Sequence, residues 1–117
     1  MSRPTKCRRI CRYPETLVFQ PQDAGGREAV VLTVDEFETI RLIDRERLSQ
    51  EEASLQMDVA RTTVQRIYDS ARRKLADMLV CGLPLRIEGG DYRLCVGGDS
   101  ICPRRNCEIR QLQKQYE

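Results

Sequence analysis

Cationic side chains gather between residues 61 and 74, where Asp69 is the only acidic residue. The cations are Arg61, Arg66, Arg72, Arg73 and Lys74, and Thr62, Thr63 and Gln65 lie among them. Arginine can make paired hydrogen bonds to guanine, glutamine can do so to adenine, and threonine can reach a base edge or a phosphate. A helix face that serves only solubility usually mixes both signs of charge. These residue types therefore favour a nucleic-acid contact surface over a merely solvated face.

The cysteines are the second set of candidate ligands. Four of the six form two close pairs far apart in the sequence, namely Cys7 with Cys11 and Cys102 with Cys107. Such an arrangement could hold a four-thiolate zinc site, or alternatively an iron–sulfur cluster, that ties both ends of the chain together. Free thiols in a reducing compartment are the competing interpretation, and the sequence leaves both open. We expect Cys81 to be a packing residue.

No enzymatic site is apparent in the sequence. The chain has no histidine, which removes the commonest general base and the commonest neutral metal ligand. The pairs Gly89–Gly90 and Gly97–Gly98 do not open a helix in the manner of a phosphate loop. The acids Asp35, Glu36, Glu38 and Asp44 are interpreted as charges favoured at a helix start and as a solvated face. We therefore predict that the protein is not an enzyme.

The N-terminus is basic but lacks a following apolar stretch, and no run of about 18 apolar residues occurs anywhere. This predicts a cytoplasmic protein without a membrane partner.

Two capping boxes mark the starts of the first two predicted helices. They pair Thr33 with Glu36 and Ser49 with Glu52. With the apolar residues that follow, they predict helices over residues 34 to 44 and 50 to 57. After a break at residues 58 to 60, a stripe of Val64, Ile67, Ala71, Leu75 and either Met78 or Leu79 predicts a third helix. This helix should end at Gly82 with a left-handed C-cap.

Less regular segments flank the helices. Residues 1 to 12 contain no acid, and their cations are Arg3, Lys6, Arg8, Arg9 and Arg12. We expect an extended arm, too polar to pack, that follows the DNA backbone or the minor groove; a solvated tail is the alternative. Short strand character is expected at residues 17 to 19. Alternation on either side of residues 88 to 91 predicts a β-hairpin after the third helix.

The fold class that results is mainly α, with a three-helix helix-turn-helix unit, an irregular N-terminal arm and a short β-hairpin. The segments are a basic arm (1–30), a DNA-binding domain (31–82) and a hairpin with a cysteine-containing tail (83–117). In a helix-turn-helix, one helix braces a second whose exposed face enters the major groove. Burial of the apolar stripe turns Thr62, Arg66, Asp69 and Arg73 outward. Ser49 and Gln50, at the start of the bracing helix, complete the predicted DNA-binding set.

Four ordered motifs also resemble a known family. They are "RPTKCRRICRYP", "VVLTVDEFETIRLID", "LSQEEASLQMDVARTTVQRIYDSARRKLADMLVCG" and "LRIEGGDY". Together, over about residues 2 to 92, they resemble the prokaryotic domain-of-unknown-function family 134. The helical part of that family is similar to region four of bacterial sigma factors. The resemblance implies a DNA-binding regulator.

The turn departs from the pattern of that family. The family pattern has a glycine where this chain has Asp58, and a serine where it has Ala60. We expect Asp58 to enter the left-handed region at some cost, and Ala60 to lack a capping hydroxyl worth roughly 1 kcal/mol. The expected result is either a slightly looser turn or a cap supplied by Asp58 itself.

Three functions from different classes remain open at this point. The first is a sequence-specific regulator that binds double-stranded DNA. The second is a sigma-like interaction module that contacts RNA polymerase or a regulator through its acidic first helix. The third is a cysteine-rich metal or redox sensor. A homodimer is usual for DNA readers of this kind, but no heptad repeat indicates one.

Overall fold

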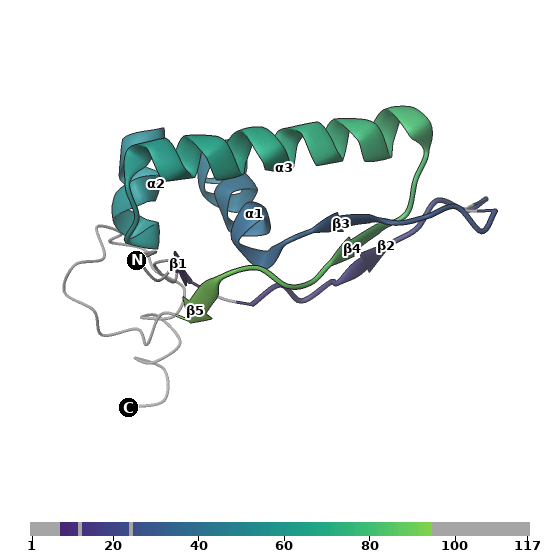
Figure 1. Cartoon of the computed structure of the whole chain (residues 1–117), viewed down its shortest axis with the longest axis horizontal. Helices are drawn as coiled ribbons and strands as arrows, with labels where there is room; N and C mark the ends of the chain where they lie inside the picture. Colours follow the sequence, from purple (N-terminus) through teal and green to yellow (C-terminus); the bar gives the residue numbers. More distant parts are fainter. Residues whose placement is uncertain (1–7, 12, 24, 95–117) are drawn as a thin grey trace, which may run out of the picture.

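The computed structural model describes residues 8–11, 13–23 and 25–94. Its elements in chain order are β1 (Arg8–Ile10), β2 (Val18–Phe19), β3 (Val30–Leu32), α1 (Val34–Thr39), the π-helix η1 (Ile40–Arg45), α2 (Gln50–Met57), α3 (Arg61–Cys81), β4 (Leu85–Ile87) and β5 (Tyr92–Leu94). The long helix α3 runs along one side, α1 and α2 lie against its first half, and the strands β2, β3 and β4 lie beside its second half (Figure 1). The predicted fold class, mainly helical around three helices, is confirmed.

Local capping chemistry sets the helix starts. The Thr33 hydroxyl accepts a hydrogen bond from the Glu36 amide, and the Glu36 carboxylate accepts one from the Thr33 amide at 2.9 Å. Ser49 and Glu52 form the same reciprocal pair at the start of α2. These bonds satisfy amide groups that a helix start otherwise leaves without partners. The expected single helix over 34 to 44 is instead α1 followed directly by η1.

The strands after α3 do not form a hairpin with each other, so the prediction of a hairpin was wrong in its pairing. Strand β4 pairs antiparallel with β2 and parallel with β3, whereas β5 pairs parallel with β1. Because β2 and β3 occupy both edges of β4, no edge remains for β5. Gly90, with a φ of 98°, lies in the connection that leads the chain away to the second sheet.

Two buried apolar clusters hold the helices in place. The first joins the strands to α3 and consists of Ile10, Leu32, Val34, Ala71, Leu85 and Ile87. The second lies between η1, α2 and the start of α3 and consists of Leu42, Ala53, Met57 and Val64. The predicted stripe of α3 is confirmed for Val64, Ile67 and Ala71, which are buried. Of its two candidate last members, Met78 packs against the first cluster, whereas Leu79 is exposed. Cys81, expected to pack, is exposed.

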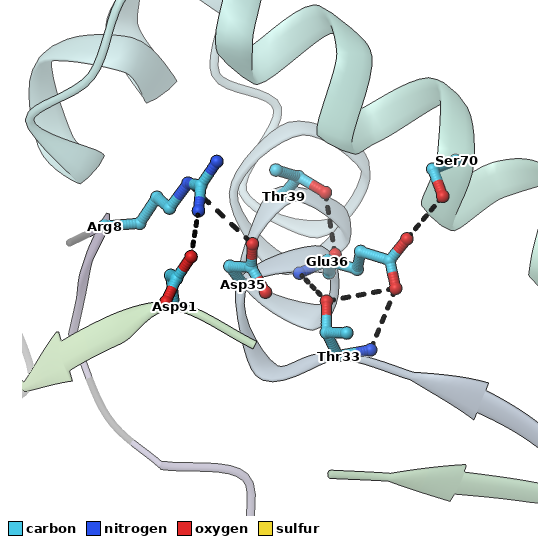
Figure 2. Close-up of polar contacts among 7 residues, drawn as sticks. All are labelled: Arg8, Thr33, Asp35, Glu36, Thr39, Ser70 and Asp91. Carbon is cyan, nitrogen blue, oxygen red and sulfur yellow. Dashed lines mark hydrogen bonds and ion pairs between the residues drawn. The ribbon is translucent and has the colours of Figure 1, made fainter. Parts of the chain in front are cut away.

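The N-terminal segment is not a free arm where the structure describes it. Arg8 and Arg9 are buried, and they pair as strand β1 with β5. The Arg8 guanidinium lies between Asp91, at 3.1 Å, and Asp35, at 3.9 Å (Figure 2). The expectation that this arm is too polar to pack was therefore wrong for these residues, because distant acids and carbonyls accept hydrogen bonds from both guanidinium groups. Of the nitrogen atoms in these two groups, only the Nε of Arg8 is buried without a hydrogen-bond partner among the described residues.

Among the described residues, no helix combines the length and apolar character needed to span a bilayer.

Candidate nucleic-acid interface

A three-residue turn joins α2 to α3 and sets the direction of the exposed helix. Asp58 adopts the left-handed conformation expected from its position, with a φ of 57°. Its carboxylate pairs with Arg93 of β5 at 3.1 Å. Ala60 precedes α3 in an extended conformation and supplies no side-chain cap, as its type predicts. The first-turn amide groups of α3 therefore have no capping side chain from the preceding residue.

The outward face of α3 brings together most of the predicted contact residues. Arg61, Thr62, Gln65, Arg66 and Arg73 are exposed. Thr62, Gln65, Arg66 and Arg73 line one shallow hollow together with Asp69, Ser70, Lys74 and Asp77. Within the part of the chain that the structure describes, Arg61, Arg66 and Arg73 make no hydrogen bond or ion pair. We refer to Arg61, Thr62, Gln65, Arg66 and Arg73 as the α3 outer face. Its three guanidinium groups have their donors available for a partner.

Two other predicted cations are held by acids of the preceding helices. Arg72 donates to Asp44 at 2.9 Å and to the Tyr68 hydroxyl at 2.8 Å, and it lies over the Tyr68 ring. Lys74 donates to Glu36 at 2.6 Å. Both cations are therefore paired with acids of this chain. Their contribution to binding a polyanion is therefore reduced compared with that of Arg66 and Arg73.

Glu36 connects the start of α1 to the middle of α3. It accepts hydrogen bonds from the Ser70 hydroxyl and from Thr33 (Figure 2). It also accepts one from the Lys74 ammonium. Burial alone would raise the pKa of Glu36, but the bonds from Lys74, Ser70 and Thr33 outweigh burial, and the pKa is lowered. The carboxylate is thus ionised at neutral pH and fixes α3 against α1.

The acids of α1 do not form the solvated face that the sequence suggested. Asp35, Glu36 and Glu38 are all buried. The reason is that each meets a cation or an amide group from elsewhere in the chain. Glu38 accepts two bonds from Arg41, at 2.7 and 3.0 Å, and one from the Cys11 amide at 2.8 Å. No acidic binding surface remains at these three positions, whereas the fourth acid, Asp44, is exposed and pairs with Arg72 at 2.9 Å.

A buried polar network behind α2 escaped sequence analysis. Arg9 donates to the Gln56 carbonyl at 2.7 Å and to the Leu55 carbonyl at 3.1 Å. Burial alone would lower the pKa of Arg41, but the bonds with Glu38 outweigh burial and the pKa is raised. The guanidinium therefore stays charged. The spacing of Glu38 and Arg41, three apart in a predicted helix, signals an ion pair but gives no sign of burial. The network fixes the N-terminal segment to the end of α2.

The remaining predicted residues lie at the start of α2, in the first turn of α3, and toward the termini. Ser49 caps α2, Gln50 begins it, and Thr63 is half-buried in the first turn of α3. Arg3, Lys6, Arg12, Cys7, Cys102 and Cys107 lie outside the described residues. Cys11 is buried, and its sulfur accepts a hydrogen bond from Gln56. The described residues contain no metal-binding group of three or more His, Cys, Asp or Glu, so the four-cysteine site remains a prediction.

Comparison with known proteins gives relatives over most of the chain. The UPF0251 protein of Desulfitobacterium hafniense strain Y51 is 56% identical over 87% of this chain and 83% of its own length. That of Ruminiclostridium cellulolyticum is 42% identical over 96% and 87%, and that of Thermoanaerobacter pseudethanolicus is 47% identical over 80% and 81%. No solved structure matches. The model of the family described as "Protein of unknown function DUF134" matches residues 1–95, and the chain belongs to this family.

Proposed function

We propose that the protein binds double-stranded DNA and reads the major groove with the N-terminal half of α3. The observation that carries the proposal is the α3 outer face. Three arginines there have no internal partner among the described residues, and they lie on the exposed side of a helix that a short turn joins to a bracing helix. A helix of this kind fits the major groove of B-DNA.

The positions along α3 suggest a division of roles. Arg61, Thr62, Gln65 and Arg66 lie in the first two turns, where recognition helices contact base edges. Arg73, about two turns further along, is suited to a backbone phosphate. Ser49 and Gln50, at the start of α2, and the partly paired Arg72 and Lys74 would add phosphate contacts at the margins. Asp69 lies within the hollow and would disfavour a phosphate at its own position.

The role that follows is a transcriptional regulator in the cytoplasm. The resemblance of the helical part to sigma factor region four supports this role. The cations Arg3, Lys6 and Arg12 are proposed to contact the DNA backbone. Arg8 and Arg9 are left out of the contact set because both are buried. A thiolate zinc site at Cys7, Cys11, Cys102 and Cys107 would be structural, ordering the termini around the helical unit.

Contact with RNA polymerase is the alternative function. That hypothesis relied on the acidic first helix, whose Asp35, Glu36 and Glu38 are buried. The test below therefore also measures binding to RNA polymerase.

The test compares two substitutions on α3 with a matched control. Selection from a random duplex pool first identifies the preferred site. Arg66→Ala should then cost about 1 to 3 kcal/mol and relax the preference at one or two positions. Arg73→Ala should weaken binding to all sequences alike and lower the salt dependence by about one phosphate. Arg86→Ala, an exposed arginine on β4, removes the same charge elsewhere and should change neither quantity.

Two results would contradict the proposal. One is equal, small effects of all three substitutions on every duplex. The other is binding to RNA polymerase that depends on Arg66 in the absence of any salt-dependent duplex binding. The second result would show that the α3 outer face binds RNA polymerase, which is the alternative function.

A further inference from the structure

A single acid lies among the residues of the α3 outer face. Asp69 is the only acidic residue between residues 61 and 74, and it is exposed. It lines the same hollow as Thr62, Arg66 and Arg73. Within the part of the chain that the structure describes, the Asp69 carboxylate makes no hydrogen bond or ion pair. The carboxylate is therefore available to whatever the α3 outer face binds.

Asp69 lies between the residues proposed to read bases and the one proposed to contact a phosphate. With 3.6 residues per turn and 1.5 Å per residue, it is about 4.5 Å beyond Arg66 along the helix axis and about 60° around it. Arg73 is about 6 Å further on and is rotated by about 40° from Asp69. The three side chains thus leave the helix in similar directions. A partner that meets Arg66 and Arg73 together must also meet Asp69.

Phosphate contact alone gives this carboxylate no favourable partner. Each phosphate that approaches Arg66 or Arg73 also approaches Asp69, and like charges repel over about 8 to 10 Å at ordinary salt concentrations. Asp69 therefore lowers the affinity of the α3 outer face for DNA of any sequence, unless a hydrogen-bond donor of the DNA meets the carboxylate.

The major groove offers such donors at two bases, through the amino groups of cytosine and adenine. An ionised carboxylate accepts hydrogen bonds and donates none, so it does not match the acceptor edges of guanine and thymine. In adenine the acceptor N7 lies beside the amino group and would face a carboxylate oxygen. In cytosine the amino group has no acceptor of the same base beside it in the groove. Cytosine is therefore the base that suits Asp69.

We propose that Asp69 is a specificity-determining residue of the protein and that it accepts a hydrogen bond from the amino group of a cytosine in the major groove. This role of Asp69 depends on the proposed function. The separation of about 4.5 Å between Arg66 and Asp69 along α3 is close to the spacing of about 3.4 Å between base pairs. The cytosine therefore belongs to the base pair next to the one that Arg66 contacts. The carboxylate also raises selectivity by repelling phosphates at sites that offer no amino group.

The test measures the affinity of the full-length chain for the selected duplex and for an unrelated duplex of equal length. Asp69→Ala should bind the unrelated duplex about threefold more tightly, because a repelling charge is lost. It should also lose about tenfold in discrimination at one base pair, where the wild type prefers cytosine. Asp77→Ala is the matched control, because Asp77 is an exposed acid of the same hollow that lies beyond Arg73. It should leave base preference unchanged. Alanine is favourable in helices, so both variants should fold.

A base analogue tests the contact itself. At the base pair where Asp69→Ala loses its preference, cytosine is replaced by an analogue that lacks only the amino group. This replacement should weaken binding of the wild type and of Asp77→Ala about tenfold, and it should leave Asp69→Ala almost unaffected. Asp69→Asn should instead change the preference toward adenine, because an amide pairs with both the amino group and N7 of that base.

Three outcomes overturn the role of Asp69. The first is a base preference that Asp69→Ala and Asp77→Ala leave equally unchanged or alter equally. The second is equal weakening of the wild type and Asp69→Ala by the analogue, which would show that the amino group meets another residue. The third is a wild type without salt-dependent binding to any duplex, which refutes the proposed function as well. A wild type that binds selectively, beside an Asp69→Ala variant with the same preference, refutes the role of Asp69 alone.

Discussion

Replacing Arg9 with methionine tests whether the N-terminal cations support the fold or contact DNA. Arg9 is 2% exposed, and its guanidinium donates to the carbonyls of Gln56 and Leu55 in the last turn of α2. A helix leaves its last carbonyls without internal partners, and a cation at that end also interacts favourably with the helix dipole. Arg9 thus serves as a distant cap that joins β1 to the bracing helix.

The expected loss of stability is large for a single substitution. A hydrogen bond from a charged donor contributes about 1.5 to 3 kcal/mol, and Arg9 makes two to these carbonyls. Methionine retains much of the apolar stem and its packing but satisfies neither carbonyl. We expect a decrease of about 3 kcal/mol or more in the free energy of unfolding, out of a typical 5 to 15 kcal/mol. This corresponds to a drop in Tm of roughly 10 °C.

Urea denaturation and amide hydrogen exchange together measure this effect. The midpoint should fall for Arg9→Met, and the amides of α2 should lose protection first. Arg86→Met, the same change at an exposed arginine of β4, should alter stability by no more than about 0.5 kcal/mol. Below the unfolding transition, duplex affinity should be unchanged. The reasoning is refuted if the urea midpoint of Arg9→Met equals that of Arg86→Met. It is also refuted if Arg9→Met keeps its stability and loses affinity for DNA.

Three further predictions concern pH, metal and the first residues. Because the pKa of Glu36 is lowered in the folded state from its ordinary value of 4.5, its contribution is present above about pH 5 and is lost as pH falls through the folded pKa. The stability difference between the wild type and Glu36→Gln, from denaturation at several pH values, should therefore shrink in acid; a constant difference would contradict this. If four cysteines hold zinc, elemental analysis after thiol-protected, chelator-free purification should give about one equivalent per chain, and its absence would favour free thiols. Deleting residues 1 to 6 removes Arg3 and Lys6 and should lower the slope of log affinity against log salt by roughly 2, without changing base preference; an unchanged slope would show that these cations do not touch DNA.

Features that depend on neighbouring residues could be predicted from the sequence. Both capping boxes are formed within four residues, and both helices begin where those boxes predict. The left-handed conformations of Asp58 and Gly82 follow from the same local logic, because each ends a periodic stretch at a residue type that tolerates positive φ. The buried stripe of α3 needed only helical spacing.

Features that depend on residues far away in the sequence could not be predicted from it. The alternation around residues 88 to 91 indicates two strands, but β4 pairs with β2 and β3, which precede it by more than fifty residues. The burial of Arg8 depends on Asp35 and Asp91, and that of Arg9 on carbonyls of α2. Arginine near the N-terminus looks solvated until its partners are known. Periodicity carries no information on such partners.

The basic residues of this chain consequently fall into two groups with different physical roles. Arg8, Arg9 and Arg41 are buried, and internal acids or carbonyls accept their hydrogen bonds. Arg61, Arg66 and Arg73 are exposed and make no bond within the described residues. A buried guanidinium with its acceptors in place would lose those bonds in order to meet a phosphate, whereas an exposed one exchanges only water and counterions. The density of arginine in the sequence is therefore a poor guide to a DNA contact surface, and the available donors on α3 are the better one.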